Sequence, residues 1–321
     1  MKRILAGLIL CLAAQCGLAQ PYPSKPIRLV IPWPPGGPSD VVGRMFGEHL
    51  AKVLKQTIVV DNRAGANGSI GASAVAHAAP DGYTLMVQNM TSQALFPTTI
   101  KNPGFDAVAD FEPITQIADS PLIVVANPGF PAANMAEFVA QARASPGTIS
   151  VASFGHGSGS HLGIELLMKL GGVRVNHVPY KGGAPAAQDT VAGHTQAAIV
   201  GVPVALPFVK QGRLRALAVT TRARAPQLPE VPTVSETREL SSYELGLMYG
   251  FLAPARTPGP IVTRLHAAAL EVLRTPEFGQ KLIELGLGSP IGNSPADMAA
   301  ATRKDVELLG SLAKAAGIQP E

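Results

Sequence analysis

Cysteine is almost absent from this chain of 321 residues. The two cysteines, Cys11 and Cys16, both lie between Met1 and Ala19. A mature protein without that segment would have no thiol, which excludes disulfides, thiol catalysis and cysteine-ligated metal sites. The lack of thiols is compatible with an oxidising compartment, where a free thiol is a liability.

Aromatic and charged residues are also scarce. Aromatic side chains make up 5% of the chain, too few for a platform that stacks the bases of single-stranded nucleic acid. Charged residues make up 15% and hydrophobic residues 46%, which is typical of a compact globular protein. The formal net charge is 26 − 22 = +4, and no dense basic run accompanies it. We therefore expect no nucleic-acid partner.

After the first residues, no apolar run has the length that a membrane span needs. Residues 1–19 have the pattern of a secretory signal, in which two basic residues precede a short apolar core and small residues end it. We expect the mature chain to begin at Gln20 and to reside in the periplasm. A lipoprotein attached at Cys16 is a weaker alternative, because Gln15 stands where a small residue is needed.

The stretch 27–40 organises the rest of the mature chain. Residues 27–32 have the composition of a buried strand, and a loop rich in proline and glycine follows. Apolar residues then repeat at spacings of three and four over 41–54, which predicts an amphipathic helix. Ser39 or Asp40 is the expected cap. The free N–H groups of this helix end would point into the loop and bind an anion without lysine or arginine.

Strand and helix patterns alternate along the remaining chain in two blocks, and its length suffices for two domains of ordinary size. The expected strands are 58–61, 83–88, 122–126, 149–153, 173–178, 197–202, 215–220 and 249–253. The expected helices are 69–79, 134–142, 162–170, 184–192 and 206–211, followed by helical structure from 260 onward. Residues 97–119 are expected to be irregular.

This alternation predicts an α/β fold with two lobes, each a mostly parallel sheet flanked by helices. We expect two strands to cross between the lobes, near 117–125 and 249–253. The first lobe then comprises 20–118 and 248–321, and the second comprises 119–247. Two such lobes can close over a cleft by a hinge motion.

Polar and glycine-rich segments follow several of the predicted strands. They are the loop 62–71, residues 89–92 and residues 154–161. In open α/β sheets, ligands bind at the edge formed by the carboxyl ends of the strands, where these segments would lie. Thr91 and Ser92 are equally compatible with simple helix capping. The loop 62–71 does not have the spacing of a dinucleotide-binding loop.

Six short motifs in order resemble the Bug (TctC-like) solute receptors, the periplasmic components of tripartite tricarboxylate transporters. The motifs are Tyr22-Pro23-Ser24-Lys25-Pro26-Ile27, Pro34-Pro35-Gly36-Gly37 with Asp40, Asn62-Arg63-Ala64-Gly65-Ala66 with Gly68 and Gly71, Asp81-Gly82-Tyr83-Thr84-Leu85, Pro179-Tyr180-Lys181-Gly182 and Gly212-Arg213-Leu214-Arg215-Ala216-Leu217-Ala218. Each motif alone is weak, but six in the same order are strong. The resemblance covers essentially the whole mature chain.

The resemblance implies two lobes that close on a small carboxylate, and a monomeric receptor that serves a membrane transporter without a cofactor or a metal. It places ligand contacts, some of them through ordered water, in the loop after the first strand and in the Tyr-Lys-Gly loop. Carried onto this chain, these contacts are Pro35, Gly36, Gly37 and Asp40 on one lobe and Tyr180, Lys181 and Gly182 on the other. The rest of the wall would come from Asn67, Thr91, Ser92, Ser158, Ser160 and His161.

One departure from the family concerns residues 200–203, where many members carry an acidic or amide residue. Here the stretch is Val200-Gly201-Val202-Pro203. An aspartate there would receive a ligand amino group, so its absence favours a ligand without a cation.

The main alternative is a secreted serine hydrolase that acts on small esters. Ser158 and Ser160 lie close in sequence to His156 and His161, as a nucleophile and a base would. However, Gly157 stands where the nucleophile elbow needs serine. A glycine-rich turn that binds an anion with hydroxyl donors is the preferred interpretation.

Metal and phosphate chemistry have little support in the sequence. None of the seven histidines belongs to a cluster with the spacing of a tight zinc site. Lys181 lies near glycines, but the chain has no P-loop run. The sequence therefore predicts reversible capture of a small carboxylate, without catalysis.

Overall fold

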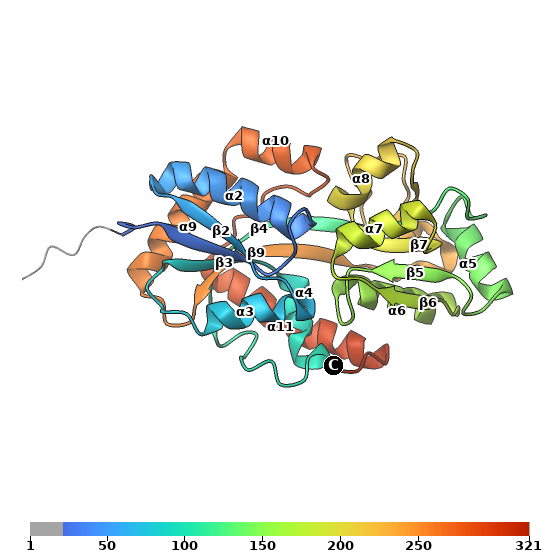
Figure 1. The fold of residues 1–321 in the computed structure, drawn as a ribbon, viewed down its shortest axis with the longest axis horizontal. Coiled ribbons are helices and arrows are strands. Elements are labelled where there is room, and N and C mark those ends of the chain that lie inside the picture. Colours follow the sequence, from blue (N-terminus) through green and yellow to red (C-terminus); the bar gives the residue numbers. More distant parts are fainter. Residues whose placement is uncertain (1–21, 321) are drawn as a thin grey trace, which may run out of the picture.

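The computed structural model describes residues 22–320. The expected signal segment 1–19, with both cysteines and Gln20 after it, lies outside the described residues. Two lobes stand side by side, and the long strands β4 (Phe111–Ala126) and β9 (Gly246–Pro254) run from one to the other (Figure 1). This arrangement confirms the predicted α/β two-lobed fold with two crossing strands.

The first lobe is built from both ends of the chain. Its parallel strands have the order β2-β1-β3, and β9 pairs antiparallel with β3. The strands are β1 Ile27–Ile31, β2 Ile58–Asn62 and β3 Thr84–Asn89. The helices are α2 Pro38–Leu54, η1 Ala66–Gly68, α3 Ser69–Ala76, α4 Met90–Thr99, α9 Gly259–Leu273, α10 Pro276–Glu284 and α11 Pro295–Ala315.

The second lobe repeats this plan with parallel strands in the order β7-β5-β6, while β4 pairs antiparallel with β7 and β8. The strands are β5 Ser150–Ser153, β6 Asn176–Pro179, β7 Ala197–Gly201 and β8 Arg215–Val219. The helices are α5 Met135–Ala144, α6 Gly159–Gly171, α7 Gly183–Ala192, α8 Val202–Lys210, η2 Val234–Glu236 and η3 Arg238–Leu240.

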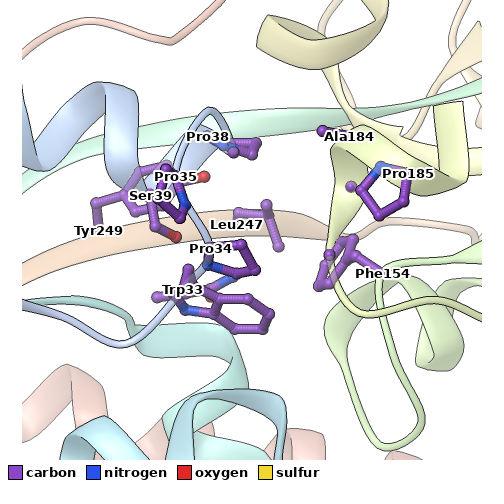
Figure 2. A pocket seen from close by; sticks show the side chains of 14 residues that line it. Trp33, Pro34, Pro35, Pro38, Ser39, Phe154, Ala184, Pro185, Leu247 and Tyr249 are labelled. Atoms are coloured by element: carbon purple, nitrogen blue, oxygen red, sulfur yellow. The ribbon is translucent and has the colours of Figure 1, made fainter. Parts of the chain in front are cut away.

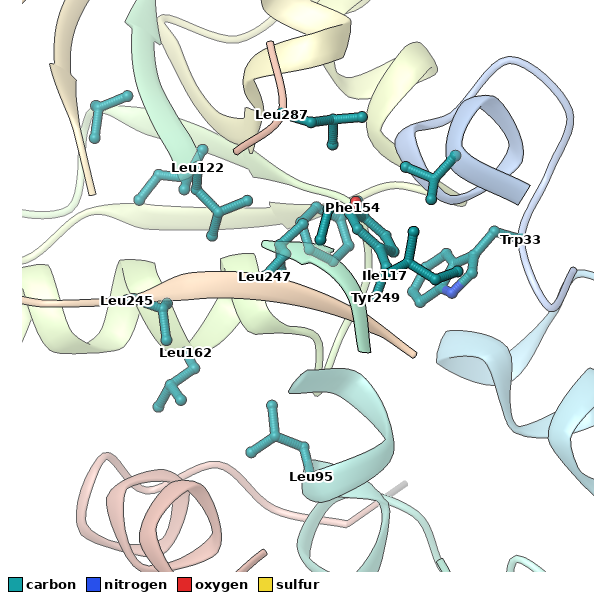
Figure 3. Packing of buried hydrophobic residues seen from close by; sticks show 14 of the residues in the cluster. Trp33, Leu95, Ile117, Leu122, Phe154, Leu162, Leu245, Leu247, Tyr249 and Leu287 are labelled. Atoms are coloured by element: carbon teal, nitrogen blue, oxygen red, sulfur yellow. The ribbon is translucent and has the colours of Figure 1, made fainter. Parts of the chain in front are cut away.

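Alternation along the strands places apolar side chains on both faces of the sheet, since successive side chains of a strand point to opposite sides. In β1, Leu29 packs with Phe46 of α2, whereas Val30 packs with Val75 of α3. One hydrophobic cluster continues from lobe to lobe along the crossing strands (Figure 3). The crossing is therefore a packed part of the core and not a bare linker.

A third segment runs beside the crossing strands. The backbone N–H groups of Gly288, Ile291 and Gly292 donate to carbonyl oxygens of β4, with N···O distances of 3.0 Å each. This segment follows α10, and Gln227 of the second lobe donates to the Leu287 oxygen at 3.0 Å. The lobes are thus joined by two strands and by this strap.

The expectation that 97–119 would be irregular is correct for 100–110 and wrong at both ends of the stretch. Helix α4 continues to Thr99 with Pro97 inside it, and β4 already begins at Phe111. Proline lacks the N–H that a ladder needs, but the register of β4 with β9 shifts next to Pro113, and such a bulge accommodates the missing donor. Pairing with β9 therefore overrides the preference of the proline-containing sequence for an irregular conformation.

Several helices begin earlier than the sequence predicts. Helix α2 begins at Pro38 with Gly37 as its cap, so Ser39 and Asp40 lie in the first turn and do not cap it. Proline fits the first turn because an N–H is unnecessary there. Helix α6 begins at Gly159 and not near 162, and α8 begins at Val202 and not near 206.

Candidate functional site

Helix starts line the cleft between the lobes. Helices α2, α4, α6 and α7 follow β1, β3, β5 and β6, so they begin at the carboxyl ends of parallel strands. The starts of α4 and α6 are capped by side chains, because Asn89 accepts from the Ser92 N–H and Ser158 accepts from the His161 N–H. The starts of α2 and α7 have glycine caps, Gly37 and Gly182, and no side-chain cap.

The two uncapped helix starts meet at a small inner cavity of about 50 Å³. Its lining residues are Trp33, Pro34, Pro35, Gly37, Pro38, Ser39, Asn89, Phe154, Gly182, Gly183, Ala184, Pro185, Leu247 and Tyr249, none of them charged. In Figure 2, Ser39 and Tyr249 lie on one side, and Ala184, Pro185 and Phe154 lie on the other. The starts of two helices from opposite lobes thus adjoin one small cavity, and none of the residues that line it carries a charge.

A larger outer cavity of about 680 Å³ adjoins the inner one and shares Trp33, Pro34 and Phe154 with it. The Trp33 and Phe154 rings meet edge to face with centroids 5.8 Å apart, one ring from each lobe. The other lining residues are Ala64, Gly65, Ala66, Asn67, Gly68, Thr99, Ile100, Gly155, His156, Tyr180 and Lys181. The two rings therefore form the boundary between the compartments.

Asp40 stabilises the loop between β1 and α2. Its carboxylate accepts from the Gly36 N–H at 2.9 Å, from Arg44 Nε at 2.8 Å and from Asn62 Nδ2 at 2.8 Å. Burial alone would raise the pKa of Asp40, but these hydrogen bonds outweigh burial and lower it. The carboxylate is thus engaged within the loop, and Asp40 lines neither cavity.

The hydroxyls of the β5–α6 loop are also engaged within the protein. Ser158 Oγ donates to the Gly155 oxygen at 2.6 Å, and Ser160 Oγ accepts from the Phe154 N–H at 3.0 Å. His161 Nδ1 accepts from the Gly157 N–H at 3.0 Å. In these contacts neither serine is paired with His161 as a nucleophile with its base.

Three histidine rings lie together at this loop, and two of them, His161 and His177, are stacked. The His161 and His177 centroids lie 4.0 Å apart, and those of His156 and His161 lie 4.7 Å apart. His177 Nε2 lies 2.6 Å from Ser153 Oγ. Burial, and then the neighbouring His161 and His156, lower the pKa of His177 to about 3. His177 is therefore neutral at neutral pH.

The structure brings six of the thirteen predicted site residues to the two cavities. Pro35, Gly37 and Gly182 line the inner one, and Asn67, Tyr180 and Lys181 line the outer one. The other seven line neither cavity: Gly36, Asp40, Thr91, Ser92, Ser158, Ser160 and His161. A direct role for these seven in ligand contact remains a prediction without support from the cavity walls.

Most of the hydroxyls that were predicted to donate to a ligand form hydrogen bonds within the protein instead. Thr91 Oγ1 donates to the Gly246 oxygen at 3.1 Å, and Ser92 Oγ is buried without a hydrogen-bond partner in the described chain. Tyr180 Oη donates to Asp189 at 2.7 Å, and burial together with this bond raises the pKa of Tyr180 to about 12. The Tyr180 hydroxyl is thus engaged within the second lobe.

Sequence reasoning missed most of the inner wall. Ser39, Asn89 and Tyr249 are the polar side chains there, and Trp33 and Phe154 are its aromatic ones. Asn89 has a local signal as a cap at the end of a strand. Tyr249 has none, because a buried aromatic residue on a crossing strand resembles any core residue.

Comparison with known proteins identifies the family. The family model "TctC: Tripartite tricarboxylate transporter family receptor" matches residues 42–318. This chain belongs to the TctC family. A curated relative is Protein BugT of Bordetella pertussis, 34% identical over 281 residues, with 86% of each chain covered. The resemblance to Bug receptors is thereby confirmed.

Solved TctC-like structures have the same fold. The Rhodopseudomonas palustris protein Rpa4515 with adipate has a TM-score of 0.90 and 33% identity, covering 94% of this chain and 100% of that one. MatC from the same organism, with bound malate, has a TM-score of 0.83 and 31% identity, covering 91% of this chain and 99% of that one. Each of these relatives of the TctC-family chain has a carboxylate bound, adipate in one and malate in the other.

Two further observations concern the part of the TctC-family chain that the structure describes. No group of three or more histidine, cysteine, aspartate or glutamate side chains within residues 22–320 is placed to hold a metal ion. None of the helices in this range is both long and apolar enough to cross a membrane.

Proposed function

We propose that this protein is a periplasmic receptor that captures a small carboxylate between its lobes and delivers it to a tripartite tricarboxylate-type transporter or to a sensor. The observation that carries the proposal is the pair of uncapped helix starts, α2 and α7, which face one inner cavity from opposite lobes. Each such end carries roughly half a positive charge, so the pair suits one carboxylate.

Neutral donors are well suited to reversible capture. Burying a full ion pair costs several kcal/mol per ion in lost hydration, whereas N–H groups and helix ends are fixed by the fold before the ligand arrives. No charged side chain is among the residues that line the inner cavity. The carboxylate would therefore be held by hydrogen bonds from both lobes, which favours the closed form.

The lining also supports a ligand without an amino group. Among the described residues that line the two cavities none is acidic, while Lys181 and His156 line the outer one. An ammonium group would find no carboxylate partner there. The bound adipate and malate of two relatives fit this class, since both are acids without a cation.

We further propose that the receptor acts as a monomer in the periplasm and performs no chemistry. Membership in a family of receptors supports the absence of chemistry. The hydrogen bonds of the Ser158 and Ser160 hydroxyls within their own loop support it too. A secreted hydrolase remains the competing proposal. Hydrolysis of p-nitrophenyl acetate by the wild type, lost in Ser158→Ala, would favour the hydrolase.

The test of the proposed function is direct ligand identification. Native mass spectrometry of protein purified from the periplasm should reveal a retained small acid. Isothermal titration calorimetry should then show binding of acids without an amino group, with succinate, malate and adipate as probes. Aspartate and glutamate are the matched amino-acid controls. Binding of the amino acids alone, or of none of the five, would contradict the proposal.

A further inference from the structure

Gly157 forms one hydrogen bond with its own lobe and another with the opposite lobe. Its N–H donates to Nδ1 of His161 at 3.0 Å, within the second lobe. Its carbonyl oxygen accepts from the side-chain amide of Asn67 at 2.9 Å, across the cleft. We call these two hydrogen bonds the latch. Asn67 lines the outer cavity, so the latch joins the lobes at the wall of that cavity.

The latch depends on the protonation state of His161. A ring nitrogen accepts a hydrogen bond only when it carries no proton, so Nδ1 is unprotonated here. The other ring nitrogen, Nε2, lies 3.4 Å from Oε1 of Glu165, one turn later on α6. The glutamate therefore faces the nitrogen that keeps the proton in the neutral ring. A second proton, at Nδ1, would place two donors against each other and break the bond to Gly157.

His161 has little room to turn away from this contact. Its side chain is 5% exposed, and its ring lies between those of His177 and His156, with centroids 4.0 Å and 4.7 Å away. Gly157 in turn lies against Thr99 of the first lobe, since a Cβ on the glycine would be 2.6 Å from the Thr99 Cβ. A proton at Nδ1 therefore displaces the loop around Gly157, and that displacement alters the contact between the lobes.

The elements that pack around the start of α6 bring few other charges to His161. Helix α4, segment η1 and strands β5 and β7 carry no charged residue, and β6 carries only His177. Segment η3 carries Arg238 and Glu239, but it packs at the C-terminal end of α6, beside Gly171. Burial and its histidine neighbours lower the pKa of His177 to about 3, so this ring stays neutral in mild acid. The titratable groups at the His161 ring are therefore Glu165, His156 and His177.

We propose that His161 is the positioning residue of the latch: its neutral ring holds Gly157 where the glycine oxygen meets Asn67, and protonation of the ring releases the closed form. This inference rests on the proposed function and deepens it, because it makes ligand capture dependent on pH. The closed form requires the neutral ring, whereas the open form tolerates both states. Acid therefore favours opening, and the affinity for a carboxylate falls as the pH falls.

The experiment measures affinities for succinate, malate and adipate by calorimetry between about pH 8 and 5.5, a range in which histidine side chains change charge. The proteins are the wild type, His161→Asn and His161→Leu. The asparagine Oδ1 atom stands where Nδ1 stands in histidine, so it can accept from Gly157 at every pH, whereas leucine has no acceptor. Titration of the ligand is common to all three proteins and cancels in the ratio of affinities.

Relative to His161→Asn, the wild type should lose about twofold to tenfold in affinity as the pH falls, as expected for one hydrogen bond. At pH 8 the two should bind about equally. His161→Leu should bind about twofold to tenfold more weakly than His161→Asn at every pH. Thermal unfolding checks that each variant is folded, and if His161→Leu is not, the wild type against His161→Asn decides.

Two further variants test the route through the latch. Asn67→Ala removes the other half of the latch, so its affinity relative to His161→Asn should no longer change with pH. His77→Asn, at an exposed histidine whose Nδ1 contacts the Ser73 oxygen of its own helix, should keep the wild-type profile.

Three results would count against the inference. If the wild type and His161→Asn have parallel pH profiles, it is overturned while the proposed function stands. It is also overturned if the full pH dependence survives in Asn67→Ala, because His161 then acts by a route other than the latch. A wild type that binds none of the three acids defeats the proposed function and the inference with it.

Discussion

The side-chain amide of Asn67 donates a hydrogen bond across the cleft to the backbone oxygen of Gly157, 2.9 Å away and 90 residues later in the chain. Asn67 belongs to η1 of the first lobe, and Gly157 to the β5–α6 loop of the second. Thr99 packs against Gly157 so closely that a Cβ there would lie 2.6 Å from the threonine Cβ. The bond therefore stabilises the closed arrangement at the outer cavity.

Asn67→Ala should weaken ligand binding about twofold to tenfold, because the closed form alone loses a hydrogen bond worth about 0.5–1.5 kcal/mol. Calorimetry measures the affinity, and small-angle scattering of the ligand-free protein should show a more open average shape. The control is Asn102→Ala, since both asparagines have a left-handed backbone conformation, with φ of 54° and 50°. Equal losses of affinity in both variants would assign the effect to backbone strain.

The fold could be predicted from the sequence where local pattern and packing agree. The helix start at Asn134 is an example: its side chain accepts from the Glu137 N–H, as the capping-box pattern predicts. The first half of β4 could not be predicted, because Pro113 opposes a strand and the partners that stabilise it, β9 and the strap, lie far away in the sequence. The proposed lobe boundaries, 118/119 and 247/248, stay a prediction within these continuous strands.

Some residues of the candidate site could likewise be predicted from the sequence, and others could not. Gly37 and Gly182 could be predicted, since a glycine-rich loop between a strand and a helix marks a helix start. Tyr249 could not, because only the pairing of β9 with β3 and β4 places it beside the inner cavity. Ser158 was expected to face a ligand, but the same hydroxyl that suits an anion also suits the cap of α6.

Asp40→Asn should reduce both stability and affinity. The change removes the charge that pairs with Arg44 and one acceptor for the Gly36 N–H, and we expect a loss of about 1–3 kcal/mol in the free energy of unfolding. The loop that bears Gly37 should then be less ordered and bind more weakly. Asp61→Asn, at a more exposed carboxylate, is the matched control.

The pH dependence of stability checks the same interaction. The pKa of Asp40 is lowered in the folded protein, so its contribution is present above the unfolded-state pKa and is lost as the pH falls through the lower, folded-state value. Urea unfolding below about pH 4 should therefore show a shallower decline in Asp40→Asn than in the wild type. Parallel declines in both proteins would contradict this account.

His177 should reduce the stability of the protein at a higher, less acidic pH than Asp40 does. Its pKa falls from 6.5 to about 3 on folding. Between these two pH values the unfolded chain binds a proton at this residue and the folded protein does not. Above pH 6.5 His177 is neutral in both states and costs no stability; as the pH falls from 6.5 toward 3, the protein loses stability by at most about 1.4 kcal/mol per pH unit. His177→Gln should flatten this slope in urea unfolding between pH 6.5 and 5. His77→Gln, at an exposed histidine, should leave it unchanged.

Gly182→Ala tests the second helix start. Gly182 has a φ of +124°, which alanine rarely adopts, and a Cβ there would lie 3.4 Å from Pro34 of the opposite lobe. The change strains the cap of α7 and fills the contact that closes the cleft, so the affinity for a bound acid should fall at least about tenfold. Gly212→Ala is the control, because its φ of +68° is also positive and nothing lies within 4 Å of a Cβ there. Gly182→Ala should lose more stability in urea unfolding, since its φ of +124° and ψ of 168° suit glycine alone, and only Gly182→Ala should lose affinity in calorimetry. Unchanged affinity in Gly182→Ala would place the bound carboxylate away from the start of α7, and the pairing of the two helix ends would no longer explain the function.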